Sequence, residues 1–440
     1  MSPDDAIAVV DTLLSPYRLT AIQEVVFRQC WQGVTYAKIA ASEGYDADYI
    51  RVTGSRLWQM LSQATGERVT KKNIQSVLRQ QIRQPPQSPA VVDSHPVQTA
   101  TFPGSPLALG SPFYVERPPV EQQAIGELLK PGGLLRIRAP EQWGKTSLMN
   151  RLVHQAKDEG FRIVRLNFYQ ADGNLLDSLD RFLRWFCANI AQQLSLSIAL
   201  DDVWDADLGS KISCTSYMQE VLLDNSEQPL LLALDNIHTI FEHATTGQEF
   251  LPMLRVWHEE AKNLPIWGGL RLLVAYSTEA YIPLQIHQSP FNVGLPIRLP
   301  AFTLAHTHQL AQRYCPGLPR QKLTALHELV NGHPYLIHLA LYSLSTCELS
   351  LDRLLAEAAQ PGGIYSEHLR NYLAILEAKP GLARALRRLL AQGTALELEP
   401  MAAYRLESMG LVTLSGSRAT VSCRLYETYF EHRLNFVPLP

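Results

Sequence analysis

The sequence predicts an α/β fold in which a parallel sheet carries helices on both faces, with helical parts before and after it along the chain. Between residues 113 and 300, short apolar runs alternate with helical stretches, as in parallel sheets that are covered on both faces. A Gly-Lys-Thr turn directly follows the first of these runs. Beyond residue 303, strand-like runs give way to helical periodicity.

The expected elements of the central part follow one another at the spacing of strand–helix units. Strands are expected over residues 134–138, 161–168, 230–234 and 270–276, because each is a short apolar run with polar or turn residues at its ends. A helix is expected from Lys145 onward, and a second one over residues 178–194, which are rich in aromatic and aliphatic side chains.

The chain beyond residue 300 is expected to form helices and then a small hairpin. Helices are predicted over residues 303–314, 320–330 and 334–344. Further helices follow, and then two short strand candidates, 411–414 and 419–422, lie on either side of a Ser-Gly-Ser turn. Helices followed by a hairpin indicate a winged helix at the C-terminal end.

Residues 1–83 have the layout of a small all-α helix-turn-helix domain. Thr35 can cap a first helix, and Gly44 can supply the turn. A second helix would present an apolar stripe at helical spacing, formed by Ile50, Leu57 and Leu61. Residues 84–112 then hold seven prolines and no helical period, so an extended linker is expected there.

Composition indicates a globular protein and argues against several classes. Of the 440 residues, 46% are hydrophobic and 18% are charged, with a formal net charge of −3, so disorder is not expected. The six cysteines are scattered and form no CxxC pair, which argues against a disulfide framework or a zinc site. The N-terminus carries acids where a signal peptide has bases, and no apolar run approaches membrane-spanning length. We expect a cytoplasmic protein without a membrane partner.

A phosphate-binding loop is indicated by the residues APEQWGKT, 139–146, between the first strand and its helix. Backbone N–H groups and the positive end of the helix dipole bind phosphate at such a turn. Lys145 would reach the β- and γ-phosphates, and Thr146 would give its hydroxyl to Mg²⁺. The usual pattern has glycine at position 139, but alanine there does not remove the anion site. The expected nucleotide-binding residues of this loop are Ala139, Pro140, Glu141, Gln142, Trp143, Gly144, Lys145, Thr146 and Ser147.

The loop predicts ATP or ADP with Mg²⁺ as ligands, and Asp235 is the second expected magnesium residue. It ends a buried strand, where magnesium-dependent NTPases place an acid. Asn236 follows at the catalytic position that usually holds a Glu or Asp. An amide can hold a water molecule but cannot take its proton, so hydrolysis should be slow, absent, or dependent on another acid such as Glu242.

Ser277 and Thr278 end the next core strand and could sense the γ-phosphate. A helix or turn cap is an equally good reading of both residues.

The motifs of this region resemble a known bacterial family. Their order is similar to that in the AAA-like domain of large signalling proteins related to STAND ATPases, which ends in a winged helix. The resemblance covers about residues 110–435. The segments that carry it include FYVERPPVE, APEQWGKTSLMNRL, LLLALDNIHTIFE, NGHPYLIHLALYSL and YRLESMGLV.

The resemblance implies further nucleotide contacts. Tyr114 and Val115 match the segment that packs on adenine in such ATPases, and core packing explains them as well. Gly332-His333-Pro334 matches the signature of the helical lid, in which Pro334 approaches the ribose and diphosphate of ADP. A proline there is also well placed to start a helix.

The resemblance also implies a nucleotide switch. In this family ADP stabilises a closed form, and ATP favours an open form that assembles, which is a population shift driven by contacts to the γ-phosphate. We therefore expect an unidentified signalling partner protein and a nucleotide-dependent homo-oligomer. Asn236 is the departure from the family pattern, and it leaves turnover uncertain. A protein that keeps nucleotide only as a structural element is a further hypothesis.

The N-terminal domain resembles the helix-turn-helix found before AAA-like modules in bacterial conflict and signalling proteins associated with vWA and MoxR. DNA binding is one reading, and it makes the chain a nucleotide-dependent DNA-binding regulator. A protein-interaction adaptor is the other, because Asp46 and Asp48 would repel phosphate and residues 1–83 carry a net charge of only +2. The candidate DNA-contacting residues are Arg51, Ser55, Arg56, Gln59, Lys71 and Lys72.

The predicted architecture is thus an α/β P-loop NTPase core with a helical lid and a C-terminal winged helix, preceded by a small all-α helix-turn-helix domain. The expected boundaries are 1–83 for the helix-turn-helix, 84–112 for the linker, 113–300 for the core, 301–365 for the lid and 366–440 for the winged helix.

Overall fold

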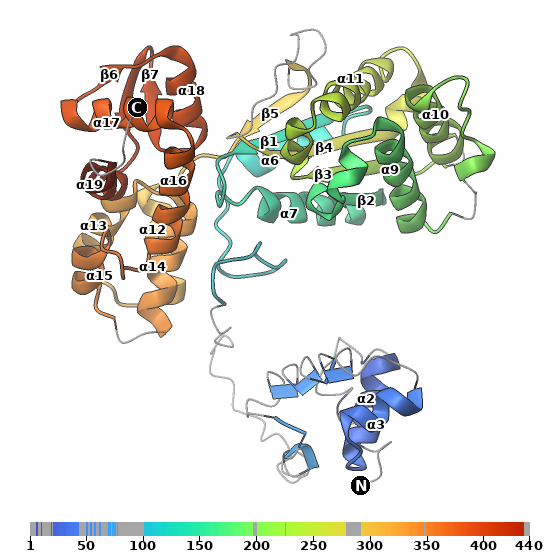
Figure 1. Cartoon of the computed structure of the whole chain (residues 1–440), viewed down its shortest axis with the longest axis horizontal. Coiled ribbons are helices and arrows are strands. Elements are labelled where there is room, and N and C mark those ends of the chain that lie inside the picture. Colours follow the sequence, from blue (N-terminus) through green and yellow to red (C-terminus); the bar gives the residue numbers. More distant parts are fainter. Residues whose placement is uncertain are drawn as a thin grey trace. The chain divides into compact units, whose positions relative to one another are not determined.

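A computed structural model gives the arrangement of the chain (Figure 1). It describes residues 101–196, 200–224, 226–278, 292–346 and 349–434. Within the first 100 residues it describes 6–7, 10, 19, 21–43, 50–51, 53–54, 57–58, 61–62, 69–71, 73–75 and 77. The chain forms two compact units, Met1–Val97 and Gln98–Pro440.

The second unit is built on a five-stranded sheet whose paired strands are all parallel, in the order β2-β3-β4-β1-β5 (Figure 1). All four predicted strands are confirmed within two residues at each end. The fifth strand was not predicted, since only Ile297 of its four residues is buried. The strands are β1 Leu134–Ala139, β2 Arg162–Asn167, β3 Leu230–Asp235, β4 Leu270–Ser277 and β5 Leu295–Arg298.

Side chains alternate between the two faces of the sheet, as the period of a strand requires. In β3, Leu230, Leu232 and Leu234 join one hydrophobic cluster, whereas Leu231 and Ala233 join another. The first cluster contains helices α9 Leu179–Gln193 and α11 Ala244–Glu260, and the second contains α6 Val120–Leu128 and α7 Lys145–Asp158. The predicted three-layer arrangement is therefore present. Shorter elements complete this part: η1 Phe168–Gln170, α8 Gly173–Leu176, η2 Leu200–Asp202, α10 Ser210–Ser216, the π-helical turn η3 Tyr217–Leu223, η4 Ile237–Glu242 and η5 Pro265–Gly269.

The helical lid consists of α12 Leu304–Tyr314, α13 Arg320–Val330, α14 Pro334–Thr346 and α15 Leu351–Glu357. The first three match the predicted helices. Thr303 begins α12 as half of a capping box, in which its side chain and that of His306 bond each other's backbone N–H groups.

Residues 366–434, called the C-terminal segment below, combine four helices with a three-stranded antiparallel sheet in the order β6-β8-β7. The expected hairpin is present, with β7 and β8 on either side of the Ser-Gly-Ser turn. Strand β6 was not predicted, because two residues give no periodicity. The elements are α16 Ser366–Ala378, α17 Pro380–Gln392, β6 Leu396–Glu397, α18 Pro400–Ser408, β7 Val412–Ser415, β8 Arg418–Val421 and α19 Arg424–Arg433.

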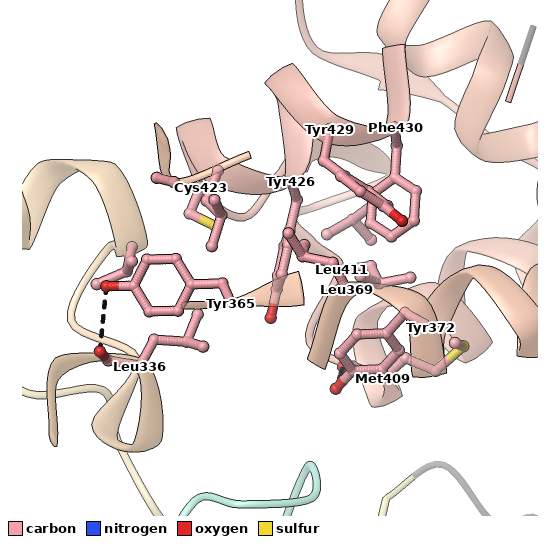
Figure 2. Packing of buried hydrophobic residues seen from close by; sticks show 14 of the residues in the cluster. Leu336, Tyr365, Leu369, Tyr372, Met409, Leu411, Cys423, Tyr426, Tyr429 and Phe430 are labelled. Atoms are coloured by element: carbon pink, nitrogen blue, oxygen red, sulfur yellow. Dashed lines mark hydrogen bonds between the residues drawn. The ribbon is translucent and has the colours of Figure 1, made fainter. Parts of the chain in front are cut away.

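The lid and the C-terminal segment share one hydrophobic core. Figure 2 shows its aromatic centre, where Tyr365 points toward Leu336 of the lid and donates a hydrogen bond to its carbonyl oxygen at 3.2 Å. Tyr372 likewise donates to the carbonyl of Met409 at 2.9 Å, next to Tyr426. Because these two parts bury their apolar side chains against each other, a movement of one part requires the other to move with it or to repack.

The first unit has its own small core around α2 Ala21–Trp31 and α3 Tyr36–Glu43. The predicted apolar stripe of the second helix is confirmed, because Ile50, Leu57 and Leu61 are fully buried. Trp58 donates its indole N–H to the Tyr36 hydroxyl at 2.6 Å. Gly44, Asp46 and Asp48 lie outside the described residues. Within the described ranges of both units, no helix combines the length and hydropathy that crossing a membrane requires.

Candidate functional site

A cavity of about 400 Å³ lies where β1, β3 and β4 end. Its walls come from the loop after β1, from the residues that follow β3, from the last residue of β4 and from the start of α14. The carboxyl ends of parallel strands are the usual location of ligand sites in such sheets. The volume lies within the range of ligand pockets.

The loop after β1 leads through a left-handed glycine into the N-terminus of a helix. Gly144 has a φ of +90° and is followed directly by the first residue of α7, so the helix N-terminus opens onto the cavity. A β-carbon at this glycine would lie 3.3 Å from the Arg117 guanidinium. Lys145 is buried, and its ammonium donates to the carbonyls of Ala139 at 3.1 Å and Pro140 at 2.8 Å. A bound phosphate would offer it a stronger, charged acceptor.

Thr146 and Asp235 meet beside this loop, with Oγ1 and Oδ1 3.4 Å apart. Asp235 is 1% exposed, because it ends the central strand β3. Its second carboxylate oxygen lies 3.4 Å from the Arg165 guanidinium. Thr146 lines the cavity, and its hydroxyl and the neighbouring carboxylate are oxygen ligands that suit Mg²⁺, whose other ligands are commonly water and phosphate. The two residues predicted to hold the metal therefore fit it.

Asn236 adopts the left-handed conformation, with a φ of +57°. Its side-chain amide donates to Oδ1 of Asn167 at 3.0 Å, across the neighbouring strand ends of β2 and β3. The amide lines the cavity and is held in place, but it offers no carboxylate. The side chain of Glu242, the alternative acid, lies outside the described residues.

Ser277 and Thr278 have different surroundings. Ser277 lines the cavity, and its buried hydroxyl has no hydrogen-bond partner among the described residues. Thr278 donates its hydroxyl to the carbonyl of Ser408 in the C-terminal segment, at 2.5 Å. Only Ser277 is thus placed to face a ligand, whereas Thr278 joins β4 to α18.

Sequence reasoning missed His238, which lines the same cavity. Its Nδ1 lies 3.3 Å from the backbone nitrogen of Ser277, and its Nε2 lies 3.2 Å from the Tyr169 hydroxyl. Burial, helped by the Lys145 charge, lowers the pKa of His238 to about 4. The available signal was its position three residues after Asp235.

Another part of the cavity lining is aromatic and apolar. Tyr114 and Val115 line it, together with Pro334 from the first turn of α14. Tyr114 donates its hydroxyl to Glu121 at 2.9 Å, and the Arg151 guanidinium lies 3.4 Å from the centre of its ring. The structure brings these predicted residues to the same cavity as the phosphate loop.

Arg117 was also missed. It is 3% exposed, and it donates to the carbonyls of Trp143 at 3.2 Å and Pro300 at 3.4 Å. Burial lowers its pKa. The side chain therefore connects the phosphate loop to the segment that precedes the lid.

Residues 103–107, called the strap below, form one more wall of the cavity. The Leu107 N–H donates to the Ser147 hydroxyl at 3.0 Å, and Arg151 donates to the carbonyl of Ala108 at 3.2 Å. The sequence placed this segment in the extended linker. Its prolines and glycine gave no sign that it would lie against the nucleotide loop.

The phosphate loop also contacts the C-terminal segment. Nδ1 of His368 lies 2.8 Å from Oε1 of Gln142, and Nε2 lies 2.8 Å from the Tyr426 hydroxyl. Trp143 packs edge-on against His333 of the lid, with ring centroids 5.3 Å apart. The loop that would hold the phosphates thus lies directly against the parts expected to move.

The sequence model of the AAA-like domain matches residues 102–432, about three quarters of the chain. The chain belongs to the AAA-like domain family. In this AAA-like protein, residues 1–81 match a second model, the N-terminal helix-turn-helix of vWA-MoxR-associated proteins. Both resemblances noted from the motifs are therefore confirmed. No curated protein sequence matches the chain.

Several solved structures resemble the AAA-like protein at a distance. A Walker-type ATPase of Pyrococcus abyssi has a TM-score of 0.49 and 12% identity, covering 72% of this chain and 96% of its own. The ORC2 protein of Aeropyrum pernix, in ADPNP–ADP complexes, has a TM-score of 0.43 and 16% identity, with coverages of 72% and 91%. A STAND protein of Pyrococcus horikoshii with a tetratricopeptide repeat sensor has a TM-score of 0.31 and 13% identity, with coverages of 76% and 44%. These similarities are too distant to carry a function over to this chain.

The candidate DNA-contacting residues of the AAA-like protein are only partly described. Arg51 is exposed. Lys71 donates to the carbonyl of Val34 at 2.6 Å and lies 5.1 Å from the Tyr36 ring centre, which favours a structural role over a phosphate contact. Ser55, Arg56, Gln59 and Lys72 lie outside the described residues.

Proposed function

We propose that this protein is an ATP/ADP-binding molecular switch that couples its nucleotide state to the docking of the lid and the C-terminal segment, and thereby to signalling or regulation. The observation that carries the proposal is the direct contact between the phosphate loop and the C-terminal segment, through Gln142 and His368. A ligand that rearranges the loop would therefore change the contact between the loop and the C-terminal segment. The C-terminal segment, with the winged-helix layout expected from its sequence, acts here as a closing element.

The site offers different contacts to the two nucleotides. Both would place a diphosphate on the N-terminus of α7 and on Lys145, whereas only ATP brings a third phosphate toward the ends of β3 and β4. A ligand shifts a conformational equilibrium only by its difference in affinity for the two states. The terminal phosphate is the group that can supply such a difference.

Hydrolysis is proposed to be slow. Asp235 would help to hold Mg²⁺, but Asn236 has no group that accepts a proton from an attacking water molecule. Its amide is already bonded to Asn167. A switch that keeps its triphosphate for long periods is consistent with this arrangement.

Removal of the lysine ammonium tests nucleotide binding. We expect Lys145→Ala to weaken binding of fluorescent ADP and ATP by roughly 10- to 100-fold, because a hydrogen bond to a charged group contributes about 1.5–3 kcal/mol. Lys157→Ala, at the exposed far end of α7, is the matched control and should bind like the wild type. If the wild-type chain binds neither nucleotide with Mg²⁺, the proposed function is wrong.

The wild type and Lys145→Ala, together with Asn236→Asp, test the proposal that Asn236 makes hydrolysis slow. Steady-state phosphate release by the wild type should stay close to the Lys145→Ala background. Asn236→Asp should raise it, since aspartate tolerates the left-handed backbone and restores a carboxylate. Rapid turnover by the wild type would show that another residue activates water and would remove the slow-hydrolysis part of the proposal.

A further inference from the structure

His238 occupies a defined place between the ends of two core strands. It lies in the turn η4, three residues after Asp235, and its ring reaches across to the last residue of β4. The residue lines the same cavity as Lys145 and Thr146, and the Lys145 charge acts on its ring. Neither the metal position nor the phosphate loop, as assigned above, uses this residue.

The hydrogen bonds of the ring set its proton position. The backbone N–H of Ser277 can only donate, so Nδ1 must accept at 3.3 Å. The ring is neutral at pH 7, because burial and Lys145 lower its pKa. Its single proton is therefore on Nε2, where it faces the Tyr169 hydroxyl at 3.2 Å.

The acceptor of that proton lies at the surface of the cavity. Tyr169 is 61% exposed and lines the cavity, so a ligand oxygen that enters the cavity can compete with its hydroxyl for the proton. Thr146 and Asp235 would hold a magnesium ion that neutralises phosphate charge on a bound triphosphate. The terminal phosphate would then lie toward the ends of β3 and β4, next to His238.

We propose that His238 is the residue through which this protein distinguishes ATP from ADP, by donating its Nε2 proton to the terminal phosphate in place of the Tyr169 hydroxyl. This inference rests on the proposed nucleotide-binding function and names the contact that separates its two states. Ser277, one of the two residues that the sequence offered as a sensor or a cap, holds the ring through its backbone N–H.

The His238 ring is also connected to the C-terminal segment, the part whose docking is proposed to depend on the nucleotide. Ser277 holds Nδ1, and the next residue, Thr278, donates its hydroxyl to the carbonyl of Ser408 at the end of α18. A shift of the His238 ring toward phosphate therefore acts on a two-residue stretch of β4 that contacts the C-terminal segment. These contacts form a contiguous connection from the ring to α18.

Two substitutions distinguish the effect of the Nε2 hydrogen-bond donor from the effect of the ring's volume. His238→Ala removes the donor, whereas His238→Gln retains an N–H group near the position of Nε2. The dissociation constants of ADP and of ADPNP, a slowly hydrolysed ATP analogue, are measured by calorimetry with Mg²⁺. His154→Ala, on the exposed side of α7, is the control.

We expect His238→Ala to weaken ADPNP binding by about 10-fold or more and ADP binding by no more than about twofold, which is the effect of one hydrogen bond to a charged group. His238→Gln should recover much of the ADPNP affinity. Equal losses for both nucleotides, or no loss for either, would overturn the assignment. A wild type that binds neither nucleotide would instead refute the proposed function.

Hydrogen exchange of α18 tests the connection to the C-terminal segment. In the wild type, ADPNP and ADP should give different protection of residues 400–408. The difference should disappear in His238→Ala and shrink in Thr278→Val, which removes the hydroxyl donor to Ser408. If His238→Ala keeps the full difference, the terminal phosphate is sensed elsewhere.

Discussion

At the scale of single residues, buried neutral histidines lie where the phosphate loop meets the lid and the C-terminal segment. Burial lowers the pKa of His338 and of His368 to about 4, and that of His333 well below its usual value. A neutral His368 with its proton on Nδ1 can donate to Gln142 and accept from Tyr426. Protonation would add a second donor where Tyr426 already donates, and would bury a charge.

These histidines predict a loss of stability in mild acid. Unfolded histidine titrates near pH 6.5, so between about pH 6.5 and 4 the unfolded chain binds more protons than the folded one. The free energy of unfolding then falls as pH falls, and each unit of pKa difference corresponds to about 1.4 kcal/mol. Above pH 6.5 these groups cause no change.

His368→Gln isolates one such contribution, because glutamine can still donate and accept but does not titrate. We expect its thermal unfolding temperature to fall less than that of the wild type between pH 7 and pH 4.5, by the equivalent of about 1–3 kcal/mol. The exposed His154→Gln variant should follow the wild type. Parallel pH curves for wild type and His368→Gln would contradict a buried neutral ring.

At the scale of elements, the turn after α18 lies directly on the phosphate loop. Gly410 ends that turn with a φ of +76°. A β-carbon there would lie 3.2 Å from Cγ and 3.5 Å from Cβ of Pro140. Glycine thus lets the C-terminal segment approach the loop closely.

Gly410→Ala should disturb this approach, and the chain offers a matched control. Gly393, after α17, has a φ of +64°, but a β-carbon there would have no neighbour within 4 Å. Both alanine variants should lose about 1–2 kcal/mol through the left-handed backbone. Only Gly410→Ala should also change ADP affinity, as measured by fluorescence titration. Equal ADP affinities in the two variants would mean that the contact with Pro140 has no role in nucleotide binding.

The sequence predicted the elements that bury a long or regular apolar face. The run before Asp235 is apolar throughout, the run before Ala139 is short and mostly apolar, and α12 to α14 have clear helical periods, so these elements were found. Strand β5 buries mainly Ile297, and β6 has two residues, so neither has a readable pattern. Of the site, the residues with motif spacing were found, such as Lys145 and Asp235. Arg117, His238 and the strap depend on contacts between distant segments, which spacing does not encode.

At the scale of the whole molecule, the N-terminal unit could bind either DNA or a partner protein. It matches a helix-turn-helix family, which allows DNA binding or protein binding. Its net charge is only +2 over residues 1–83, and the Lys71 ammonium already donates to Val34 within the unit. Phosphate contacts by lysine and arginine dominate affinity for DNA. These observations favour a protein adaptor.

We therefore expect the full chain to form no stable complex with duplex DNA at about 150 mM salt, with ADP or with ADPNP, in a mobility-shift assay. Weak binding at low salt that disappears as salt rises would reflect nonspecific attraction. A complex that survives at 150 mM salt, depends on the nucleotide and weakens in Arg51→Ala would instead establish the DNA-binding alternative.

One wall of the candidate nucleotide site is formed by the strap. In the sequence, the strap lies between the N-terminal unit and the predicted start of the core. Composition places the boundary of the core at residue 113, yet residues 103–107 line the cavity and Leu107 is bonded to Ser147. A protein shortened to begin at residue 113 would therefore lack one side of its own binding site. Release of the strap would open this side of the cavity, so we expect the strap to lengthen the residence time of a bound nucleotide.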